Sequence, residues 1–166
     1  MKYLVESDRL LLRNFELSDA NVYHQMTRDP DIQLYVPSAY GDTPRETFRL
    51  VRDYNKLMDG INDFYLILEK KDSHELIGAI IATAITTSPL CLDMAIITHK
   101  NHRRCGYMYE ALTRFREVLP KGTEMWFTIA EKNIASYSTV SKLPGATNLC
   151  LGDPEDQVGY HLCVIV

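Results

Sequence analysis

Residues 93–112 read DMAIITHKNHRRCGYMYEAL and carry three structural signals in succession. The stretch begins inside an apolar run, Leu90 to Thr98, which is typical of a largely buried strand. A polar turn follows over 100–104, and residues 108–118 then place apolar side chains at helical spacing. The next apolar segment, Glu124 to Ile129, is a short strand. This order predicts a β-α-β unit late in the chain.

The turn inside this stretch is basic, although the chain has a formal net charge of −4. Lys100, Arg103 and Arg104 lie within five residues and lead into a helix N-terminus, where the first amides lack partners and the helix dipole is positive. Gly106 allows unusual backbone angles and the close approach of a ligand. Together these features predict a cradle for a phosphate or pyrophosphate. A solvated basic turn is the alternative that the charges alone would favour.

The other periodic segments extend this unit into a complete domain. Ser18 is expected to cap the first helix, Thr43 and Glu46 are expected to form a capping box on the second, and residues 31–42 are expected to connect the two irregularly. Strands are predicted over 9–15, 64–70, 76–86, 90–98, 124–129 and 158–166, and helices over 18–28, 43–60, 108–118 and 133–143. The sequence therefore predicts one α/β domain over residues 1–166. Its central mixed, mostly antiparallel sheet carries helices on both faces.

Composition excludes several classes of protein. With 166 residues, 46% of them hydrophobic and 24% charged, the chain fits a single soluble globular domain. Eight Gly, seven Pro and four Cys do not fit a collagen-like, disordered or disulfide-scaffold protein. The longest apolar stretch, Leu76 to Ile85, is too short for a membrane helix, and the N-terminus lacks an apolar signal region. No membrane association is expected.

Cysteines and histidines give no sign of a metal site. The four cysteines form no CxxC pair, which predicts free thiols in a reducing compartment, the cytoplasm. They are Cys91, Cys105, Cys150 and Cys163. His99 and His102 form an HxxH pair, but the neighbouring Lys100, Arg103 and Arg104 would repel a divalent cation, so no metal is expected. The net negative charge also argues against a nucleic-acid-binding module built on residues 99–104.

Short motifs follow one another along nearly the whole chain. Residues 103–108 are similar to the pattern Arg-x-x-Gly-x-Gly/Ala, with Met108 at the last position, and residues 109–112 are similar to a Thr-Glu-Ala-Leu helix start. Residues 133–136 and 141–143 are similar to Asn-x-x-Ser followed by Glu-Lys-Leu. Further matches upstream lie at 9–13, 18–20, 29–31 and 76–78. In these motifs the chain resembles the GNAT superfamily of N-acetyltransferases, and most of all its RimJ/RimL-like branch, which acetylates ribosomal-protein N-termini.

The resemblance implies a GNAT-like fold and acetyl-CoA as the co-substrate. The pyrophosphate would be held by backbone amides of the turn. The strand that ends at Thr98 would splay from its neighbour, so that its backbone, including Ile96, Ile97 and Thr98, pairs with the pantetheine arm. The turn residues implied in cofactor binding are Arg103, Arg104, Cys105, Gly106, Tyr107 and Met108.

Three residues are candidates for chemistry or cofactor orientation, and each has a plainer alternative. Asp93 lies where the resembled branch places a strand glutamate, and it could accept the proton of an amine directly or through water; the alternative is an ordinary solvent-facing acid. Ser136 could donate a hydrogen bond to the leaving thiolate, or it could be a surface serine. Asn133 could orient pantetheine amides, or cap the helix that follows it.

Two departures from the family pattern leave a second function open. Met108 replaces a small residue and is expected to crowd the phosphate site. Val140 stands where many members carry a tyrosine acid that protonates the thiolate. The leading hypothesis is an acetyl-CoA-dependent N-acetyltransferase in which a primary amine attacks directly in a ternary complex. The alternative is a degenerate member that binds CoA without turnover.

The acceptor is expected to lie between the two early helices, near residues 29–40 and Tyr54. Tyr35 and Tyr40 would suit a peptide or an amphipathic amine, although core packing is the commoner use of such side chains. The acceptor class is thus a protein or peptide N-terminus or a small amine. A homodimer is compatible with this interpretation.

Overall fold

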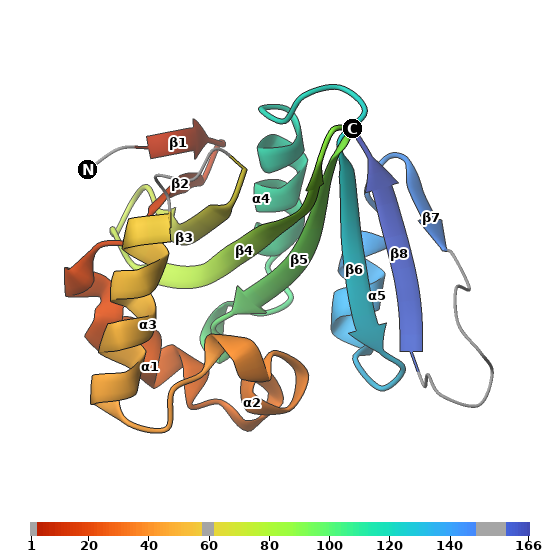
Figure 1. Ribbon diagram of the computed structural model, residues 1–166. Helices are drawn as coiled ribbons and strands as arrows, with labels where there is room; N and C mark the ends of the chain where they lie inside the picture. The colour runs from red at the N-terminus through yellow and green to blue at the C-terminus, as the bar shows by residue number, and fades with distance from the viewer. Residues whose placement is uncertain (1–2, 58–61, 149–158) are drawn as a thin grey trace.

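A single eight-stranded sheet organises the computed structural model, which describes residues 3–57, 62–148 and 159–166 (Figure 1). The strand order is β1-β2-β3-β4-β5-β6-β8-β7. The strands are β1 (Tyr3–Glu6), β2 (Leu10–Asn14), β3 (Phe64–Lys70), β4 (Leu76–Thr87), β5 (Leu90–Thr98), β6 (Glu124–Ala130), β7 (Ala146–Asn148) and β8 (Gly159–Ile165). The predicted mixed, mostly antiparallel sheet is confirmed, because β5 and β6 form the one parallel pair among the described strands.

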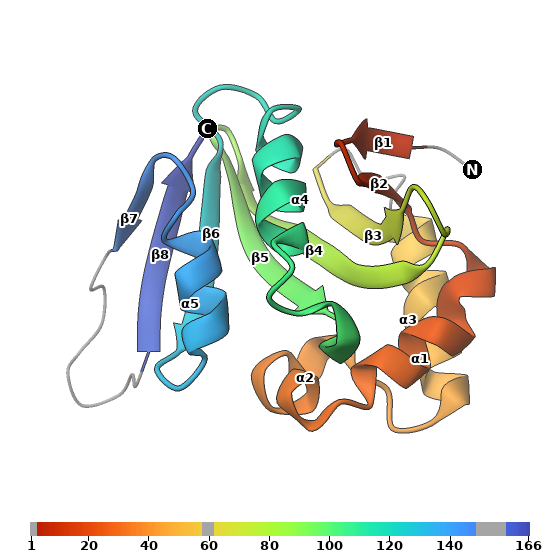
Figure 2. The ribbon, with the colours of Figure 1, turned by 180° about the vertical axis from the view of Figure 1, so that it is seen from behind.

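Helices cover both faces of the sheet, as predicted (Figures 1 and 2). They are α1 (Ala20–Thr27), α2 (Pro30–Tyr35), α3 (Pro44–Leu57), α4 (Tyr107–Arg116) and α5 (Ile134–Val140), with 3-10 turns η1 (Leu17–Asp19), η2 (Pro37–Ala39) and η3 (Lys100–His102). The longest helix, α3, has 14 residues, and no helix of the described ranges has the length and apolar character needed to cross a bilayer.

Alternation along the central strands divides the interior into two cores. Leu66 and Leu68 of β3 face α4, whose apolar stripe ends in the fully buried Phe115. Tyr65 and Ile67 point to the opposite face and pack under α1 and α3. This is the period-2 pattern of a strand buried on both sides, and it explains why the strand predictions were accurate.

The early part of the chain differs from the prediction in its helix starts. The capping box of α3 is confirmed, since the Glu46 amide donates to Thr43 Oγ1 at 3.2 Å and the Thr43 amide donates to Glu46 Oε2 at 3.0 Å. The Ser18 cap is wrong: Glu16 opens a 3-10 turn, and the Glu16 amide donates to Asp19. The far end of α3 was expected at Met58 and Gly60, which lie outside the described residues.

Residues 31–42 are not the irregular connection that was predicted. Asp29 caps α2 by accepting a hydrogen bond from the Asp31 amide at 2.9 Å, and Pro30 occupies the first helical position, where its missing N–H costs nothing. Pro37 starts η2 in the same way. The two short strands β1 and β7 were also missed, because three or four residues carry too little periodicity.

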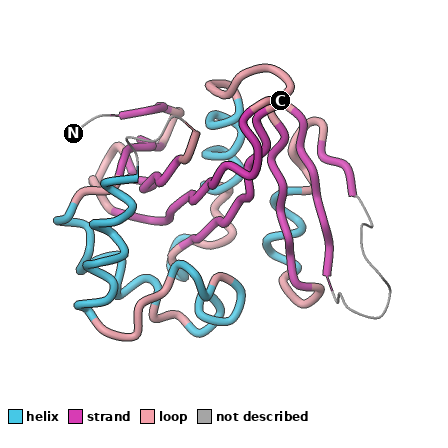
Figure 3. Tube along the Cα trace, viewed as in Figure 1, coloured by secondary structure: helices cyan, strands magenta, loops and turns pink. Residues whose placement is uncertain are grey.

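The sheet opens between β5 and β6, as the family resemblance implied. The parallel register covers three pairs, which start at Cys91 with Glu124 and end at Asp93 with Trp126. Beyond that point β5 stays paired with β4 as far as Thr98, whereas β6 stays paired with β8 as far as Ala130. Figure 3 shows the two strands diverging. The polar groups of two strand edges are thereby exposed inside one sheet.

Candidate functional site

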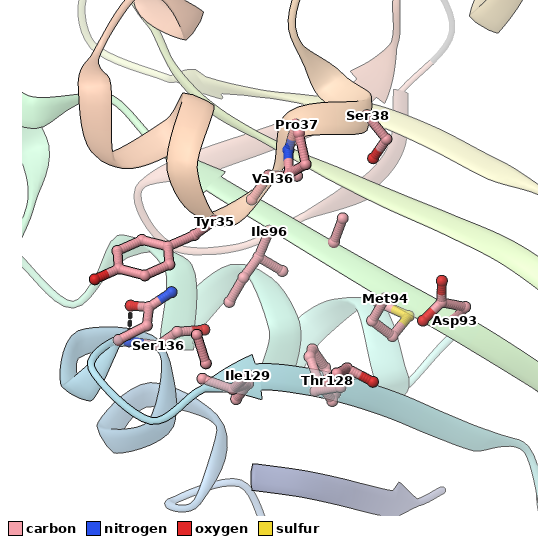
Figure 4. A pocket seen from close by; sticks show the side chains of 14 residues that line it. Tyr35, Val36, Pro37, Ser38, Asp93, Met94, Ile96, Thr128, Ile129 and Ser136 are labelled. Carbon is pink, nitrogen blue, oxygen red and sulfur yellow. Dashed lines mark hydrogen bonds between the residues drawn. The ribbon is translucent and has the colours of Figure 1, made fainter. Parts of the chain in front are cut away.

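A cleft of about 170 Å³ lies in the opening between β5 and β6 (Figure 4). One wall is β5 from Asp93 to Ile96, and the opposite wall is β6 from Phe127 to Ala130. Asn133 and Ser136, at the start of α5, extend the second wall, and residues 35–38 between α2 and η2 close the cleft from the side. Segments from four parts of the chain thus meet where the sheet separates.

The free backbone groups of β5 can be assigned from the register with β4. The amide of His99 donates to the carbonyl of Ile77 at 2.8 Å, so odd-numbered residues at this end of β5 bond to β4. The amides and carbonyls of Ile96 and Thr98 therefore point away from β4, towards the opening. Of the two residues Ile96 lines the cleft, and the Thr98 carbonyl accepts a hydrogen bond from Arg103 Nε at 3.3 Å. Ile97 lies outside the cleft: its backbone is in register with Ala79 and its side chain is 1% exposed.

The turn before α4 presents a row of amides at the far end of β5. Arg104 and Gly106 both have positive φ, 63° and 78°. The first helical hydrogen bond runs from the Glu110 amide to the Gly106 carbonyl, so the amides of residues 107–109 have no acceptor within the helix. This is the backbone geometry of an anion-binding turn, with the positive end of the helix dipole behind it.

Arg9 braces this turn from the other end of the chain. Its Nε donates to Glu110 Oε2 at 2.6 Å, its Nη1 donates to the Cys105 carbonyl at 3.1 Å, and its guanidinium lies 4.3 Å from the centre of the Tyr107 ring. Burial alone would raise the pKa of Glu110, but hydrogen bonds from Ser7 and Arg9 bring it below its usual value. Sequence analysis noted Arg9 as part of a motif but could not pair it with a residue 101 positions away.

Two of the three basic side chains of the predicted cradle, Arg103 and Arg104, are placed differently. The Arg103 guanidinium contacts the carboxylates of Asp29 and Asp31, at the N-terminus of α2, at 3.2 and 2.8 Å. Its side chain is therefore engaged by protein groups. Arg104 is exposed, with its left-handed backbone shaping the turn. The cradle consists of backbone amides more than of free cations.

The candidate base and the candidate thiolate partner lie in the same cleft (Figure 4). Asp93 is the last residue of β5 that pairs with β6, and its exposed side chain forms no ion pair with any described residue. Ser136 lies on α5 and lines the other wall. Asn133 lines it too, but its Oδ1 accepts a hydrogen bond from the Ser136 amide at 3.2 Å, which makes it the cap of α5.

Comparison of the sequence with protein-family models shows which family this fold belongs to. Residues 9–144 match the family model described as an acetyltransferase (GNAT) domain. The chain belongs to the GNAT acetyltransferase family. It is therefore an acyltransferase, and the family uses acetyl-CoA. No curated protein matches the sequence significantly.

Solved structures of GNAT proteins share this fold at low identity. A GNAT-family acetyltransferase from Bacillus anthracis superimposes with a TM-score of 0.76 at 20% identity, over 97% of each chain. RimL, described as a ribosomal L7/L12 alpha-N-protein acetyltransferase, gives 0.79 at 15%, over 98% of this chain and 95% of its own. Spermidine N-acetyltransferase from Vibrio cholerae, in complex with CoA and spermine, gives 0.75 at 18%, over 96% of each chain. At such identities the likeness establishes the fold alone.

Both departures from the GNAT pattern lie in the core. Met108 is 7% exposed and packs with Leu112 and Phe115 under the sheet, so its side chain does not crowd the amide row, contrary to expectation. Val140 is fully buried in the same core, so a tyrosine at this position would have to displace packed side chains. Neither orientation could be inferred from motif alignment, because helix phase and packing decide it.

The structure places the three tyrosines of the expected acceptor region in different surroundings. Tyr35 lines the cleft, but Tyr40 lies at a separate surface depression beside α3. Tyr54 is 7% exposed and stacks on Tyr65 with ring centres 4.5 Å apart, so it belongs to the core. Burial raises the pKa of the Tyr54 phenol above its usual range.

No group of three or more His, Cys, Asp or Glu side chains in the described ranges is placed to hold a metal ion. His102 of the HxxH pair instead contacts Glu75 at 2.9 Å. Cys91, Cys105 and Cys163 are free thiols, and Cys150 lies outside the described residues.

Proposed function

We propose that the protein is an acetyl-CoA-dependent N-acetyltransferase whose acceptor, a primary amine, attacks directly in a ternary complex. The observation that carries this proposal is the cleft between β5 and β6, which runs from Asp93 towards the braced amide row of α4. A pantetheine arm is extended, carries amides and ends in a charged pyrophosphate. The exposed edge of β5 and the helix N-terminus offer the matching groups at its two ends.

The cofactor contacts follow from which groups are free. The amides of the turn and of residues 107–109 bind the pyrophosphate, with Arg103 contributing through its backbone rather than its side chain. The backbone of Ile96 and the amide of Thr98 pair with the pantetheine, and Asn133 holds the start of α5 against the arm. Acetyl-CoA supplies an acetyl thioester when bound. The Ile96 amide is the hydrogen-bond donor available to the thioester carbonyl.

Asp93 is the general base of this proposal. An attacking amine must lose its proton, and a carboxylate at the closed end of the cleft can accept it directly or through one water. Ser136 donates a hydrogen bond from its hydroxyl to the sulfur as charge develops there. Because a thiol of pKa about 8.5 leaves readily near neutral pH, a tyrosine acid at position 140 is not required.

The finer assignment is to the RimJ/RimL-like branch, with a protein or peptide N-terminus or a small amine as acceptor. Motifs over 9–13, 103–112 and 133–136 support it, as does the structural likeness to RimL. We also propose that residues 1–166 form one domain and that the protein works in the cytoplasm, where the three described thiols would stay reduced.

The test combines binding with turnover. Acetyl-CoA at 100 times its Kd should stabilise the fold by about 2.7 kcal/mol and raise the melting temperature. Release of CoA is then measured against a panel of amines and N-terminal peptides, with one acceptor expected to accelerate it. A thermal shift without acceptor-dependent release would indicate the degenerate member that binds CoA without turnover. No shift and no release would refute the proposal.

Ser136→Ala should lower kcat by roughly 5- to 30-fold, which corresponds to about 1–2 kcal/mol, the value of one hydrogen bond to a charged group. The affinity for acetyl-CoA should change little. Ser138→Ala, on the same helix but outside the cleft lining, is the matched control and should keep full activity. A loss of more than roughly a thousandfold in folded Ser136→Ala would make the serine an obligatory proton donor and contradict this account.

A further inference from the structure

Arg103 connects the cofactor turn to the opposite side of the cleft. Its Nη1 donates to Asp31 Oδ2 at 2.8 Å, and its Nη2 lies 3.2 Å from Asp29 Oδ1. Its Nε donates to the carbonyl of Thr98, the last residue of β5, at 3.3 Å. One guanidinium thus joins the end of β5 to the start of α2, and it does so across the 72 positions that separate Arg103 from Asp31.

The two aspartates belong to the segment that closes the cleft. Asp29 caps α2, and the chain leaving α2 supplies residues 35–38 of the cleft wall. Within α2 itself Ile32 is the residue buried in the core, so apolar packing anchors this six-residue helix at one point. A second attachment is needed to fix its direction, and the Arg103 contacts provide it.

The lowered pKa of Asp29 is consistent with an ion pair between Asp29 and Arg103. Burial would raise the pKa of Asp29, but hydrogen bonds from the Asp31 amide and from Arg103 bring it below its usual value. The pair is therefore intact above the ordinary titration range of aspartate, and it is lost as the pH falls through the lowered pKa of the folded state.

We propose that Arg103 is a positioning residue for the acceptor: by holding α2, it sets the distance between residues 35–38 and β5. The proposal rests on the proposed function, because it assigns the acceptor to the space that this wall bounds. It also separates two tasks within one motif. The turn backbone binds the cofactor, and the Arg103 side chain shapes the acceptor side.

The Arg103 ion pairs are expected to contribute little to the stability of the fold. The side chains of Arg103 and Asp31 are 32% and 63% exposed, and ion pairs at such positions contribute little to the free energy of unfolding. A shift of the wall, however, misplaces the acceptor relative to the reacting carbonyl, and small misplacements are costly to rate. Removing the pair should therefore affect acceptor kinetics while the protein stays folded.

The test is a double-mutant cycle on Arg103→Gln and Asp31→Asn. With the best acceptor of the panel, each single variant should raise the acceptor KM by roughly tenfold or more, while the acetyl-CoA Kd stays within about twofold. The double variant should be no worse than Arg103→Gln alone, since that change already removes the contact with Asp31. Arg103→Lys keeps the positive charge but lacks the planar guanidinium that reaches both aspartates, so its acceptor KM should be intermediate. Arg52→Gln, which removes an exposed pair with Asp53 on α3, is the control and should change nothing.

Other outcomes are decisive against the role. If Arg103→Gln weakens acetyl-CoA binding and leaves the acceptor KM unchanged, the side chain is a phosphate ligand and not an acceptor-positioning group. Additive losses in the double variant, or unchanged kinetics throughout, would equally overturn it. Failure of the proposed function looks different: the unmodified protein would then release no CoA with any amine, whether or not acetyl-CoA raises its melting temperature.

Discussion

Replacing Asp93 with asparagine should lower kcat by at least about a hundredfold, with little change in the Kd for acetyl-CoA. Asparagine fills the same space at the last β5 residue that pairs with β6, but it cannot accept the proton of an amine. The side chain is exposed and forms no ion pair with a described residue, so its removal should not destabilise the fold. Steady-state kinetics with a good acceptor, together with a thermal melt, measure both effects.

The pH profile supplies a second readout for Asp93. In the unmodified enzyme the rate should fall on the acidic side as the base becomes protonated, and Asp93→Asn should remove or move that limb. Asp72→Asn is a suitable control, because Asp72 is an exposed acid in the β3–β4 connection, paired with Lys70 at 3.3 Å and not part of the cleft lining. Near-full activity in Asp93→Asn would show that the amine loses its proton to bulk water.

Gly106→Val should abolish the thermal shift produced by acetyl-CoA. Gly106 has φ of 78°, which costs a β-branched residue about 1–3 kcal/mol, and its added Cβ would lie 3.6 Å from Arg9 Nη2. The contact with Arg9 is an ordinary van der Waals distance, so it is the backbone strain that would move the turn, and the amide row of α4 would then no longer match a pyrophosphate. The expected change is the loss of the whole binding contribution, about 2.7 kcal/mol at 100 times the Kd.

Backbone strain and cofactor binding can be separated within this chain. Gly122 has φ of 83°, and nothing lies within 4 Å of a Cβ built there. Gly122→Val therefore carries the same left-handed strain at a distance from the cleft. It should lower the melting temperature yet keep the acetyl-CoA shift. An unchanged shift in Gly106→Val would place the cofactor elsewhere.

The strands and the long helices could be predicted because local signals and tertiary packing agree. Alternation in β3 and the capping box of α3 each specify a local structure that the fold retains. The short elements β1 and β7 exist because their neighbours offer an edge to pair with. Nothing within three or four residues reports that neighbour.

The parts of the candidate site that are formed by local backbone structure could be predicted from the sequence. The parts that are formed by side-chain contacts between distant residues could not. Gly106 and the helix start indicated the anion-binding turn directly. The Arg9–Glu110 brace and the Arg103–Asp31 pair join residues 101 and 72 positions apart, which no local pattern encodes. The strand face was equally hidden: only the register with β4 separates the cleft-facing backbone of Ile96 and Thr98 from that of Ile97.

The short parallel pairing between β5 and β6 affects how the sheet folds. Strands β1 to β5 each pair with their sequence neighbour, so that half of the sheet closes through nearby contacts and is expected to form early. Strand β6 joins it through three residue pairs after a helical crossover, and then pairs along its length with β8. A ligand lying across both strands adds cohesion between two separately built halves. In the proposed function, the free energy of cofactor binding would thus also hold the two halves of the sheet together.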